Sequence, residues 1–354
     1  MSEPRTMRAS FLDQAQACSA LGSPFTAALL TRAADWLDGG TAIAMRLRHW
    51  PELGAGDAVP LRFTGAVHAL ALSGRAPALA DAYDRLKDRE DPDFNQLWPI
   101  MAKAIGANTE FVDRFLDTPP QTNEVGRAAV LMAAAHELAA RAPLPFHLLE
   151  CGASAGLNLV FDQYRYRLGE VNAGPGSAEL HLVPDWSGPS PPPADIDVAG
   201  RSGCDAAPLD LQNEADRLRL RSYIWADQPP RLARLNAAID TARAAGVAIE
   251  RAAIGNWLEE ALAPRRTGCL TVLFHTIVWQ YLPAYEAALA EARIREAGAR
   301  ATKEAPLARL AMEWNPATSS AQISLTTWPG GETRQLGFAH AHGDWIEWKG
   351  WREA

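Results

Sequence analysis

Cysteine is scarce in this 354-residue chain, which has only Cys18, Cys151, Cys204 and Cys269 and no C-x-x-C pair. Four scattered cysteines exclude a disulfide framework and a zinc knuckle. We expect free thiols, because unpaired cysteine is commonly buried as a small apolar residue. No apolar signal segment follows the charged residues at 1–10, so the expected compartment is the reducing cytoplasm.

Long hydrophobic runs and an excess of basic charge are also missing. No stretch approaches the roughly 18 uninterrupted apolar residues of a membrane-spanning helix, so no membrane partner is expected. The chain has 34 basic and 42 acidic residues, with a net charge of −8. Because nucleic-acid-binding proteins usually carry a basic patch, this balance argues against a nucleic-acid partner. The expected partner is a small-molecule substrate, and no oligomeric state is predicted.

Apolar residues make up 48 % of the chain, which excludes a mostly disordered protein. Up to residue 141 the apolar positions recur at helical spacing. Two prolines at 119–120 end the first series of helices, and a further helix is expected to run to about Arg141. We predict an all-α N-terminal domain over 1–120 and a second domain over 121–354.

From Pro145 the chain alternates short apolar runs with helical segments, which is typical of βα units and a mostly parallel sheet. We expect an α/β fold with a doubly wound, Rossmann-like sheet of about seven strands. Gly330 and Gly331 replace a helix between the last two runs, so these should form an antiparallel hairpin at one sheet edge. An insertion covers about 164–195, and its proline tract cannot enter a central strand. The apolar runs are 146–150, 196–205, 247–253, 269–275, 307–314, 323–328 and 337–348, and the expected helices are 155–163, 208–223, 230–245, 257–263 and 282–299.

The strongest local feature is the segment Phe146–Leu159, with the sequence FHLLECGASAGLNL. It has an apolar strand that ends in an acid, then a glycine-rich turn, then an expected helix. Such a turn lets the backbone approach a ligand and directs helix N–H groups at it. The pattern differs from the dinucleotide motif G-x-G-x-x-G, so NAD is disfavoured. Its E-x-G-x-x-x-G form looks like the first motif of S-adenosylmethionine-dependent methyltransferases. The candidate cofactor-binding residues here are Glu150, Gly152, Ser154, Gly156 and Asn158.

Two other interpretations of this turn stay open. Residues 152–156 also spell G-x-S-x-G, the nucleophile elbow of serine hydrolases, with Ser154 as nucleophile and His340 or His342 as a late histidine. An elbow normally follows several strands, whereas the residues before this turn read as helical and contain no HGG-type loop. The third interpretation is a tight turn without a ligand.

The second strand of a doubly wound sheet should end in an acid that can bind ribose hydroxyls. Val198–Asp205 has that form, and Pro208 is expected to begin a long helix after it. The alternative second strand is Glu179–Val183, followed by Asp185. We prefer Asp205 as the cofactor-binding acid.

The next two strands supply further candidates. Asn256 and Trp257 follow the third strand, where an adenine ring would lie; simple helix packing is the alternative for Trp257. The fourth strand leads into His275, whose imidazole is suited to general-base work near neutral pH. In methyltransferases the loop after this strand faces the transferred methyl group. The candidate catalytic residues are therefore His275, Gln280 and Tyr281, with Trp279 binding the substrate; a structural histidine and core aromatics are the alternatives.

Three residues on either side of the glycine-rich turn complete the predicted substrate site. Asn123 and Arg127 enter the helix before the glycine-rich turn, and an arginine there can pair with a carboxylate in bidentate fashion. Tyr164 follows the turn. An ordinary helix cap and a solvated first turn is the alternative for Asn123 and Arg127.

His340 and His342 lie two residues apart and therefore on one face of a strand. With Glu313 they raise the possibility of a metal site. The third ligand is only guessed and the spacing is common by chance, so no metal is predicted.

These residues make the chain recognisable: it resembles a bacterial family of uncharacterised proteins, domain of unknown function 2332. The resemblance covers nearly the whole chain. It implies a methyltransferase-like core behind a helical N-terminal region, and it supplies no established activity. One departure is Gly255-Asn256, which stands where we would expect acidic residues in relatives. The matching stretches are 121–127, 148–159, 162–166, 201–211, 217–228, 275–283, 328–332 and 340–348.

The leading functional hypothesis is S-adenosylmethionine-dependent methyl transfer to a small molecule. The glycine-rich turn and Asp205 would hold the cofactor, and the residues after His275 would shape the acceptor pocket. Methyl transfer mainly requires alignment, so positioning can supply much of the catalysis. The alternatives are a serine hydrolase that uses Ser154 and a non-catalytic nucleotide-binding protein of the same fold.

Overall fold

The computed structural model describes residues 6–51, 57–89, 93–263 and 266–351. The chain forms two compact units, one of Met1–Thr122 with Asn213–Ala233 and one of Asn123–Gln212 with Arg234–Ala354. Residues 213–233, which the sequence placed in the second domain, thus cluster with the helical unit. In the described ranges, no helix has both the length and the apolar character needed to cross a membrane.

The first unit is all-helical, and polar caps begin several of its helices. Side-chain oxygens of Thr6, Ser23 and Thr41 accept N–H groups three residues later, which satisfies donors that an α-helix leaves free at its start. The core gathers buried phenylalanine and leucine side chains from α1 to α7, together with Tyr223, and the partly buried Leu218 of α9 packs against it. The helices are α1 (Met7–Ala20), α2 (Pro24–Trp36), α3 (Ala42–Arg48), α4 (Val59–Leu72), α5 (Pro77–Leu86), α6 (Phe94–Ala107), α7 (Thr109–Leu116) and α9 (Glu214–Ser222).

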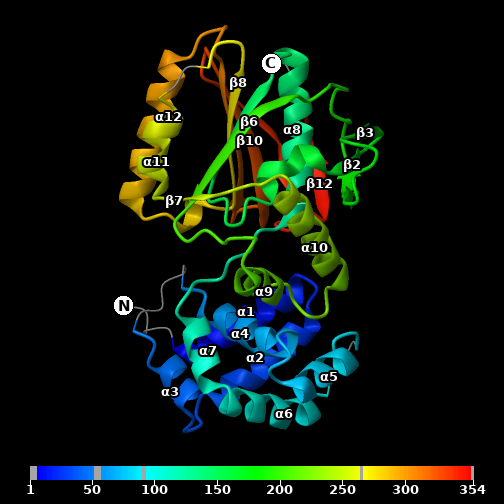
Figure 1. Cartoon of the computed structure of the whole chain (residues 1–354), viewed down its shortest axis with the longest axis vertical. Coiled ribbons are helices and arrows are strands. Elements are labelled where there is room, and N and C mark those ends of the chain that lie inside the picture. Colours follow the sequence, from blue (N-terminus) through cyan, green and yellow to red (C-terminus); the bar gives the residue numbers. More distant parts are fainter. Residues whose placement is uncertain (1–5, 52–56, 90–92, 264–265, 352–354) are drawn as a thin grey trace. The chain divides into compact units, whose positions relative to one another are not determined.

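The second unit is built on a sheet that has nine strands within the described residues, in the order β5-β12-β11-β10-β9-β8-β1-β6-β7. Helices α11 and α12 lie on one side of it and α8 on the other (Figure 1). The strands are β1 (Phe146–Cys151), β5 (Asp185–Ser187), β6 (Val198–Asp205), β7 (Glu250–Arg251), β8 (Leu270–Thr276), β9 (Leu307–Asn315), β10 (Ser320–Trp328), β11 (Glu332–Ala339) and β12 (Trp345–Trp348). The helices are α8 (Ala128–Arg141), α10 (Pro229–Ala244), which runs from the first unit into the second, α11 (Ile254–Ala261) and α12 (Ala284–Arg300).

The parallel half of the sheet places β1 at its centre. β1 pairs in parallel with β6 on one side and with β8 on the other, and β7 and β9 extend the two wings, also in parallel. The strand order therefore reverses at β1, which is where doubly wound sheets bind ligands. The choice of 198–205 as the second strand is confirmed. The alternative was wrong, because His181–Leu182 is β4 of a separate three-stranded sheet with β2 (Arg165–Leu168) and β3 (Val171–Ala173).

The antiparallel half corrects two expectations. In the described part of the chain the sheet has nine strands rather than seven, and the predicted hairpin, β10 with β11, is antiparallel but lies inside the sheet. The run at 337–348 breaks at a turn and yields the separate strand β12. The insertion then returns β5 to the edge, parallel to β12. Sequence periodicity predicts neither the separate strand β12 nor the edge position of β5, since both depend on pairing between distant segments.

Three expected elements are shorter than predicted. The helix after the glycine-rich turn is only the 3-10 segment η2 (Asn158–Gln163), with a non-helical Val160 inside it. The helix expected from Pro208 begins at Glu214, where Asn213 caps it. The third strand has two residues, β7. The helices expected at 230–245, 257–263 and 282–299 are present within a few residues, as α10, α11 and α12.

Candidate functional site

The glycine-rich loop at 152–157 leaves the carboxyl end of β1, and neighbouring segments hold it. Gly152 and Ala153 donate their N–H groups to the carbonyl of Cys204, at 2.9 and 3.0 Å. Ser154 N donates to Oδ2 of Asp205 at 2.9 Å, and Leu157 N donates to Oδ1 of Asn123 at 2.9 Å. The loop is therefore a closed structure whose own neighbours accept these four donors.

Gly152 needs to be glycine for two reasons. Its φ is +70°, and a Cβ there would lie 2.6 Å from Cγ2 of Val278. The Val278 side chain thus occupies the space beside the loop where the sequence predicts a cofactor. Ile277 before it has φ +58°, and a β-branched residue in that region stores about 1–3 kcal/mol of strain.

Asp205 is predicted to bind ribose, but both of its carboxylate oxygens accept hydrogen bonds from backbone N–H groups. Oδ2 accepts from Ser154 and Oδ1 accepts from Ala207 at 2.8 Å. Asp205 therefore positions the loop. Ser154 has φ +54°, the strained geometry of an elbow, but it is only 4 % exposed. A nucleophile must reach its substrate, so this burial argues against the hydrolase interpretation.

Two buried polar side chains beside the loop are unsatisfied. Oε2 of Glu150 and Oδ1 of Asn158 have no hydrogen-bond partner among the described residues. Burial raises the pKa of Glu150 well above its ordinary value, and the nearby Asp205 carboxylate adds to the rise, while Arg127 opposes it. The protonated, neutral form of Glu150 is therefore favoured over the carboxylate relative to an exposed glutamate. Unsatisfied buried polar groups are uncommon and mark a place where a ligand group can bind.

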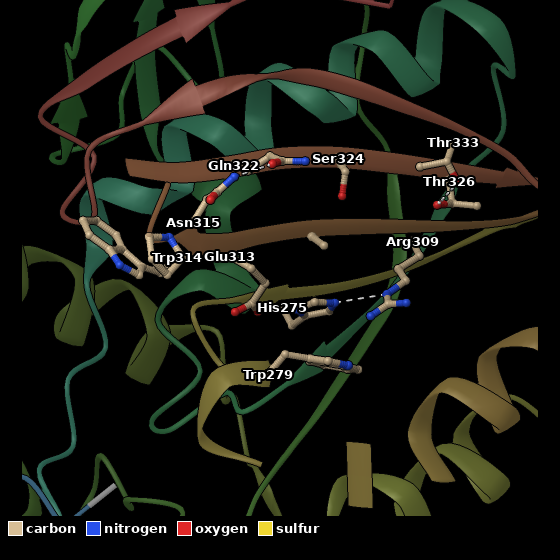
Figure 2. Close-up of a pocket in the computed structure, with 12 residues that line it drawn as sticks. His275, Trp279, Arg309, Glu313, Trp314, Asn315, Gln322, Ser324, Thr326 and Thr333 are labelled. Atoms are coloured by element: carbon tan, nitrogen blue, oxygen red, sulfur yellow. Dashed lines mark hydrogen bonds and ion pairs between the residues drawn. The ribbon is translucent and has the colours of Figure 1, made fainter. Parts of the chain in front are cut away.

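A second constellation surrounds His275 at the end of β8 (Figure 2). Nδ1 of His275 lies 2.5 Å from Oε1 of Glu313, and Nε2 accepts from Nε of Arg309 at 3.1 Å. Burial lowers the pKa of His275, although the Glu313 carboxylate works in the opposite direction. Because Nε2 accepts a hydrogen bond from Arg309, the imidazole proton lies on Nδ1, which faces Glu313.

Trp279 and Arg309 extend this network. The Trp279 ring stacks on His275 with 3.7 Å between centroids. Arg309 forms two hydrogen bonds with the Glu291 carboxylate, at 2.8 and 2.6 Å, and lies over the Trp279 ring at 4.7 Å. Trp279 Nε1 also donates to Glu291 at 2.8 Å. The side chains are thus fixed by one another before any ligand arrives.

These side chains border a cavity of about 570 Å³, which we call the trough (Figure 2). It opens on the α12 side of the sheet. Alternate residues of a strand face one side, and those of β9 and β10 on this side are only partly buried. The volume and the mixture of aromatic and polar groups suit a small polar molecule. The trough residues are His275, Trp279, Arg309, Ala311, Glu313, Trp314, Asn315, Pro316, Gln322, Ser324, Thr326 and Thr333.

The structure brings His275 and Trp279 together in the trough and places Gln280 and Tyr281 on the neighbouring 3-10 turn η3 (Trp279–Tyr281). Tyr281 is 59 % exposed and Gln280 is exposed. On α11, Asn256 is exposed whereas Trp257 is buried in the core between the sheet and α12, as its packing alternative expected.

The predicted substrate residues have structural partners. Nε of Arg127 donates to the carbonyl of Ala341 and its NH1 group donates to the carbonyl of Thr276. Tyr164 is fully buried and its hydroxyl donates to the carbonyl of Leu157. Asn123 holds the loop rather than capping a helix.

Sequence reasoning missed Arg309 and Glu291 and gave Glu313 a different role. The available signal was the alternation within 307–315, where Arg309 and Glu313 interrupt an apolar run at positions that share one face. All four cysteines are free, as expected.

Comparison with known proteins gives one family. The family model described as an uncharacterized protein conserved in bacteria (DUF2332) matches residues 8–348. A search of the curated proteins found no match. Because the family model spans nearly the whole chain, the chain belongs to this family of bacterial proteins.

Proposed function

We propose that the chain is an S-adenosylmethionine-dependent methyltransferase that acts on a small polar molecule. The observation that carries the proposal is the order β7-β6-β1-β8-β9, with a glycine-rich loop after the central strand and an acid at the tip of β6. In a sheet of this kind the ligand lies at the carboxyl ends of the strands beside the reversal of strand order.

The chemistry of the buried groups fits the cofactor. When bound, the cofactor supplies a methyl group on a positively charged sulfur and also carries an ammonium group. Glu150 and Asn158 offer unpartnered oxygens beside the loop, and a carboxyl that loses its proton would pair with a cation. Asp205 holds the loop in place through its hydrogen bond from Ser154 N.

The space beside the loop is filled by Val278 rather than open. We therefore expect the Ile277–Val278 segment to shift when the cofactor binds. Strain at Ile277 lowers the cost of that shift, because leaving a left-handed conformation releases energy. Val278 N donates to both oxygens of Glu313, at 3.0 and 3.1 Å. Since Glu313 also borders the trough, one carboxylate connects the two halves of the proposed site.

The trough is the proposed acceptor pocket. Its amides and hydroxyls, such as those of Gln322 and Ser324, suit a neutral acceptor with hydroxyl or amide groups. Both nitrogens of His275 are engaged, so we assign it a positioning role toward Arg309.

The test is calorimetry with S-adenosylmethionine and S-adenosylhomocysteine. Val278→Ala removes the methyl groups that fill the loop and weakens the closed form by roughly 1–2 kcal/mol, so binding should tighten about five- to thirtyfold. Val183→Ala, at an exposed position of the insertion, is the matched control and should behave like wild type. If neither wild type nor Val278→Ala binds at millimolar concentration, the cofactor assignment is rejected.

A fluorophosphonate probe tests the hydrolase alternative, for which the φ of Ser154 is the favouring observation. Covalent labelling of wild type that disappears in Ser154→Ala would replace the methyltransferase proposal. We expect no labelling, because Ser154 is buried.

A further inference from the structure

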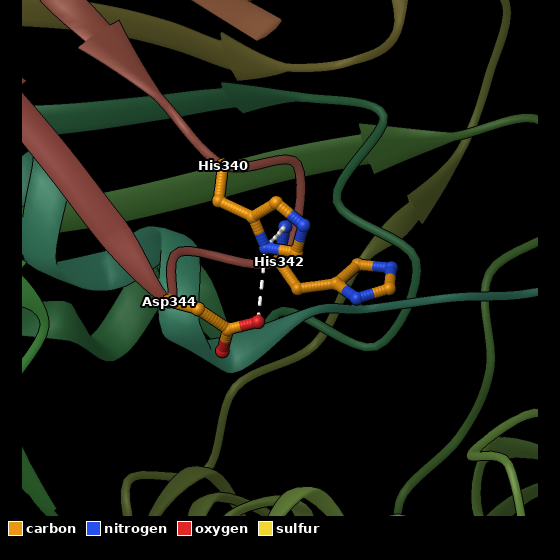
Figure 3. Close-up of side chains that lie close together, drawn as sticks. All are labelled: His340, His342 and Asp344. Atoms are coloured by element: carbon orange, nitrogen blue, oxygen red, sulfur yellow. Dashed lines mark hydrogen bonds and ion pairs between the residues drawn. The ribbon is translucent and has the colours of Figure 1, made fainter. Parts of the chain in front are cut away.

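The turn between β11 and β12 gathers three side chains that can bind a metal ion (Figure 3). Nδ1 of His340 lies 2.9 Å from Oδ2 of Asp344. The rings of His340 and His342 are 5.2 Å apart between centroids and nearly perpendicular, at 82°. One ligand atom from each of the three residues can be chosen so that all lie within 4.8 Å of one another. The sequence paired these histidines with Glu313, which instead bonds to His275.

The turn is held firmly before any ion arrives. His340 N donates to the carbonyl of Trp345 at 3.0 Å, and Gly343 N donates to the carbonyl of His340 at 2.9 Å. Gly343 has φ +76°, and a Cβ there would lie 2.3 Å from the backbone carbon of Gly126. The backbone of the turn therefore packs directly on the segment that precedes α8, which fixes where the three side chains begin.

We propose that His340, His342 and Asp344 bind a divalent first-row transition-metal ion such as Zn²⁺. Imidazole nitrogen and carboxylate oxygen bind Zn²⁺ at about 2.0–2.2 Å, so bound ligand atoms lie roughly 3–3.5 Å apart. The ligand atoms, now within 4.8 Å of one another, would therefore move closer together by side-chain rotation when an ion binds. Two imidazoles disfavour Mg²⁺ and Ca²⁺, which prefer oxygen ligands.

The site would keep an open coordination position. Three protein ligands leave a fourth position for water or substrate, the arrangement of catalytic rather than structural zinc. The exposure of the cluster agrees with this, since the Asp344 side chain is 49 % exposed and that of His340 is 19 % exposed. A solvent molecule can therefore reach the ion.

Charged side chains of both signs surround the cluster. NH2 of Arg234 lies 3.5 Å from Oδ1 of Asp344 and 3.8 Å from Oε1 of Glu124. Glu124 and Asp344 supply two carboxylates, and Arg234 and Arg127, whose Nε donates to the carbonyl of Ala341, supply two guanidinium groups. Attraction for a cation therefore comes from the ligand atoms themselves. Arg234 also occupies the Asp344 oxygen that points away from His340, and such outer contacts orient metal-binding carboxylates.

The location connects the cluster to the carboxyl edge of the sheet. Arg127 donates to the carbonyl of Ala341 within the turn and to the carbonyl of Thr276 at the end of β8. One side chain thus ties the proposed metal site to the strand that carries His275. The inference does not depend on methyl transfer, because it rests on the donor set alone.

The experiment uses the full chain after dialysis against EDTA. Zn²⁺ is titrated by calorimetry, and Co²⁺ is followed by its visible absorption, which reports nitrogen and oxygen coordination. We expect one ion per chain. His342→Gln and Asp344→Asn should each lower the affinity at least about tenfold, whereas His181→Gln, at an exposed histidine of the small sheet, should leave it unchanged.

Unfolding midpoints in EDTA show whether each variant is folded. A folded His342→Gln chain that has lost Co²⁺ absorption supports the site. The proposal is overturned if wild type binds neither ion, or if His342→Gln and Asp344→Asn bind as tightly as His181→Gln.

Discussion

The Glu313 carboxylate accepts hydrogen bonds from Nδ1 of His275, at 2.5 Å, and from the backbone N–H of Val278, at 3.0 Å. His275 lines the trough, and Val278 fills the space beside Gly152. One side chain therefore fixes both the candidate acceptor pocket and the segment that closes the glycine-rich loop. A shift of Val278 would therefore also disturb the hydrogen bond between this carboxylate and His275.

Glu313→Gln should destabilise the second unit. An amide presents one acceptor oxygen and its own NH₂ group to two N–H donors, so at least one donor is left without a good partner. The cost of such a buried loss is about 1–3 kcal/mol. Thermal unfolding of the full chain measures it, with Glu347→Gln at an exposed position of β12 as the control. Equal midpoints for the two variants would show that the pairing carries no stability.

Glu150→Gln should change how stability depends on pH. Burial raises the pKa of Glu150, so the folded protein keeps this proton after the unfolded chain has lost it. Stability contributed by the proton is complete below the unfolded pKa of about 4.5 and falls as pH rises toward the folded pKa. At pH 8 the glutamine variant should therefore unfold at a higher temperature than wild type, and the gap should close at pH 4. A variant less stable than wild type at pH 8 contradicts the assignment.

The same residue predicts proton release on cofactor binding. A cation beside Glu150 favours the carboxylate and lowers its pKa, so binding should become tighter as pH rises toward the pKa of the free protein. Calorimetry in buffers of different ionisation enthalpy counts the released protons. The value should be above zero for wild type and lower for Glu150→Gln. Identical proton counts would place the cation away from Glu150.

His68 predicts an acid-sensitive step in the helical unit. Burial lowers its pKa to about 4, although hydrogen bonds to the carbonyls of Ser222 and Ile224 oppose the change. Below the unfolded pKa of about 6.5, His68 binds a proton in the unfolded chain but stays neutral in the folded unit. The free energy of unfolding therefore falls as pH falls from 6.5 to about 4. Between pH 7 and pH 5 the loss is about 2 kcal/mol. Denaturant unfolding should show a shallower pH dependence for His68→Gln than for His49→Gln, which alters an exposed histidine; parallel curves would contradict the prediction.

Gly65→Ala tests the packing of α4 against the α9 end. A Cβ at Gly65 would lie 2.5 Å from Cε1 of Tyr223, so the ring must move. Overpacking of this kind costs about 1–3 kcal/mol. Gly106→Ala in α6 is the matched control, because nothing lies within 4 Å of its added Cβ, and it should be neutral or stabilising by about 0.5–1 kcal/mol. Thermal unfolding that ranks Gly106→Ala below Gly65→Ala would overturn this account.

The sequence by itself determined the features that depend on local pattern. The helical first half follows from apolar spacing and polar caps, and an apolar strand followed by glycines marks β1 and its loop. The acid at 205, followed by a turn, identified β6 as the second strand despite the insertion. Each of these signals lies within a short window, where backbone preference and side-chain periodicity decide the outcome.

Only the tertiary structure decided what surrounds the loop and the histidines. Val278 lies against Gly152 although more than a hundred positions separate them, and Oδ2 of Asp205 accepts from Ser154 N in the loop while its Oδ1 accepts from the neighbouring Ala207 N. The Asp344 carboxylate pairs with His340, while the Glu313 carboxylate bonds to His275. Such pairings depend on strand order and register, because adjacent strands bring together residues that no local pattern connects. β5 reaches the sheet edge for the same reason: its partner β12 is formed by the far end of the chain.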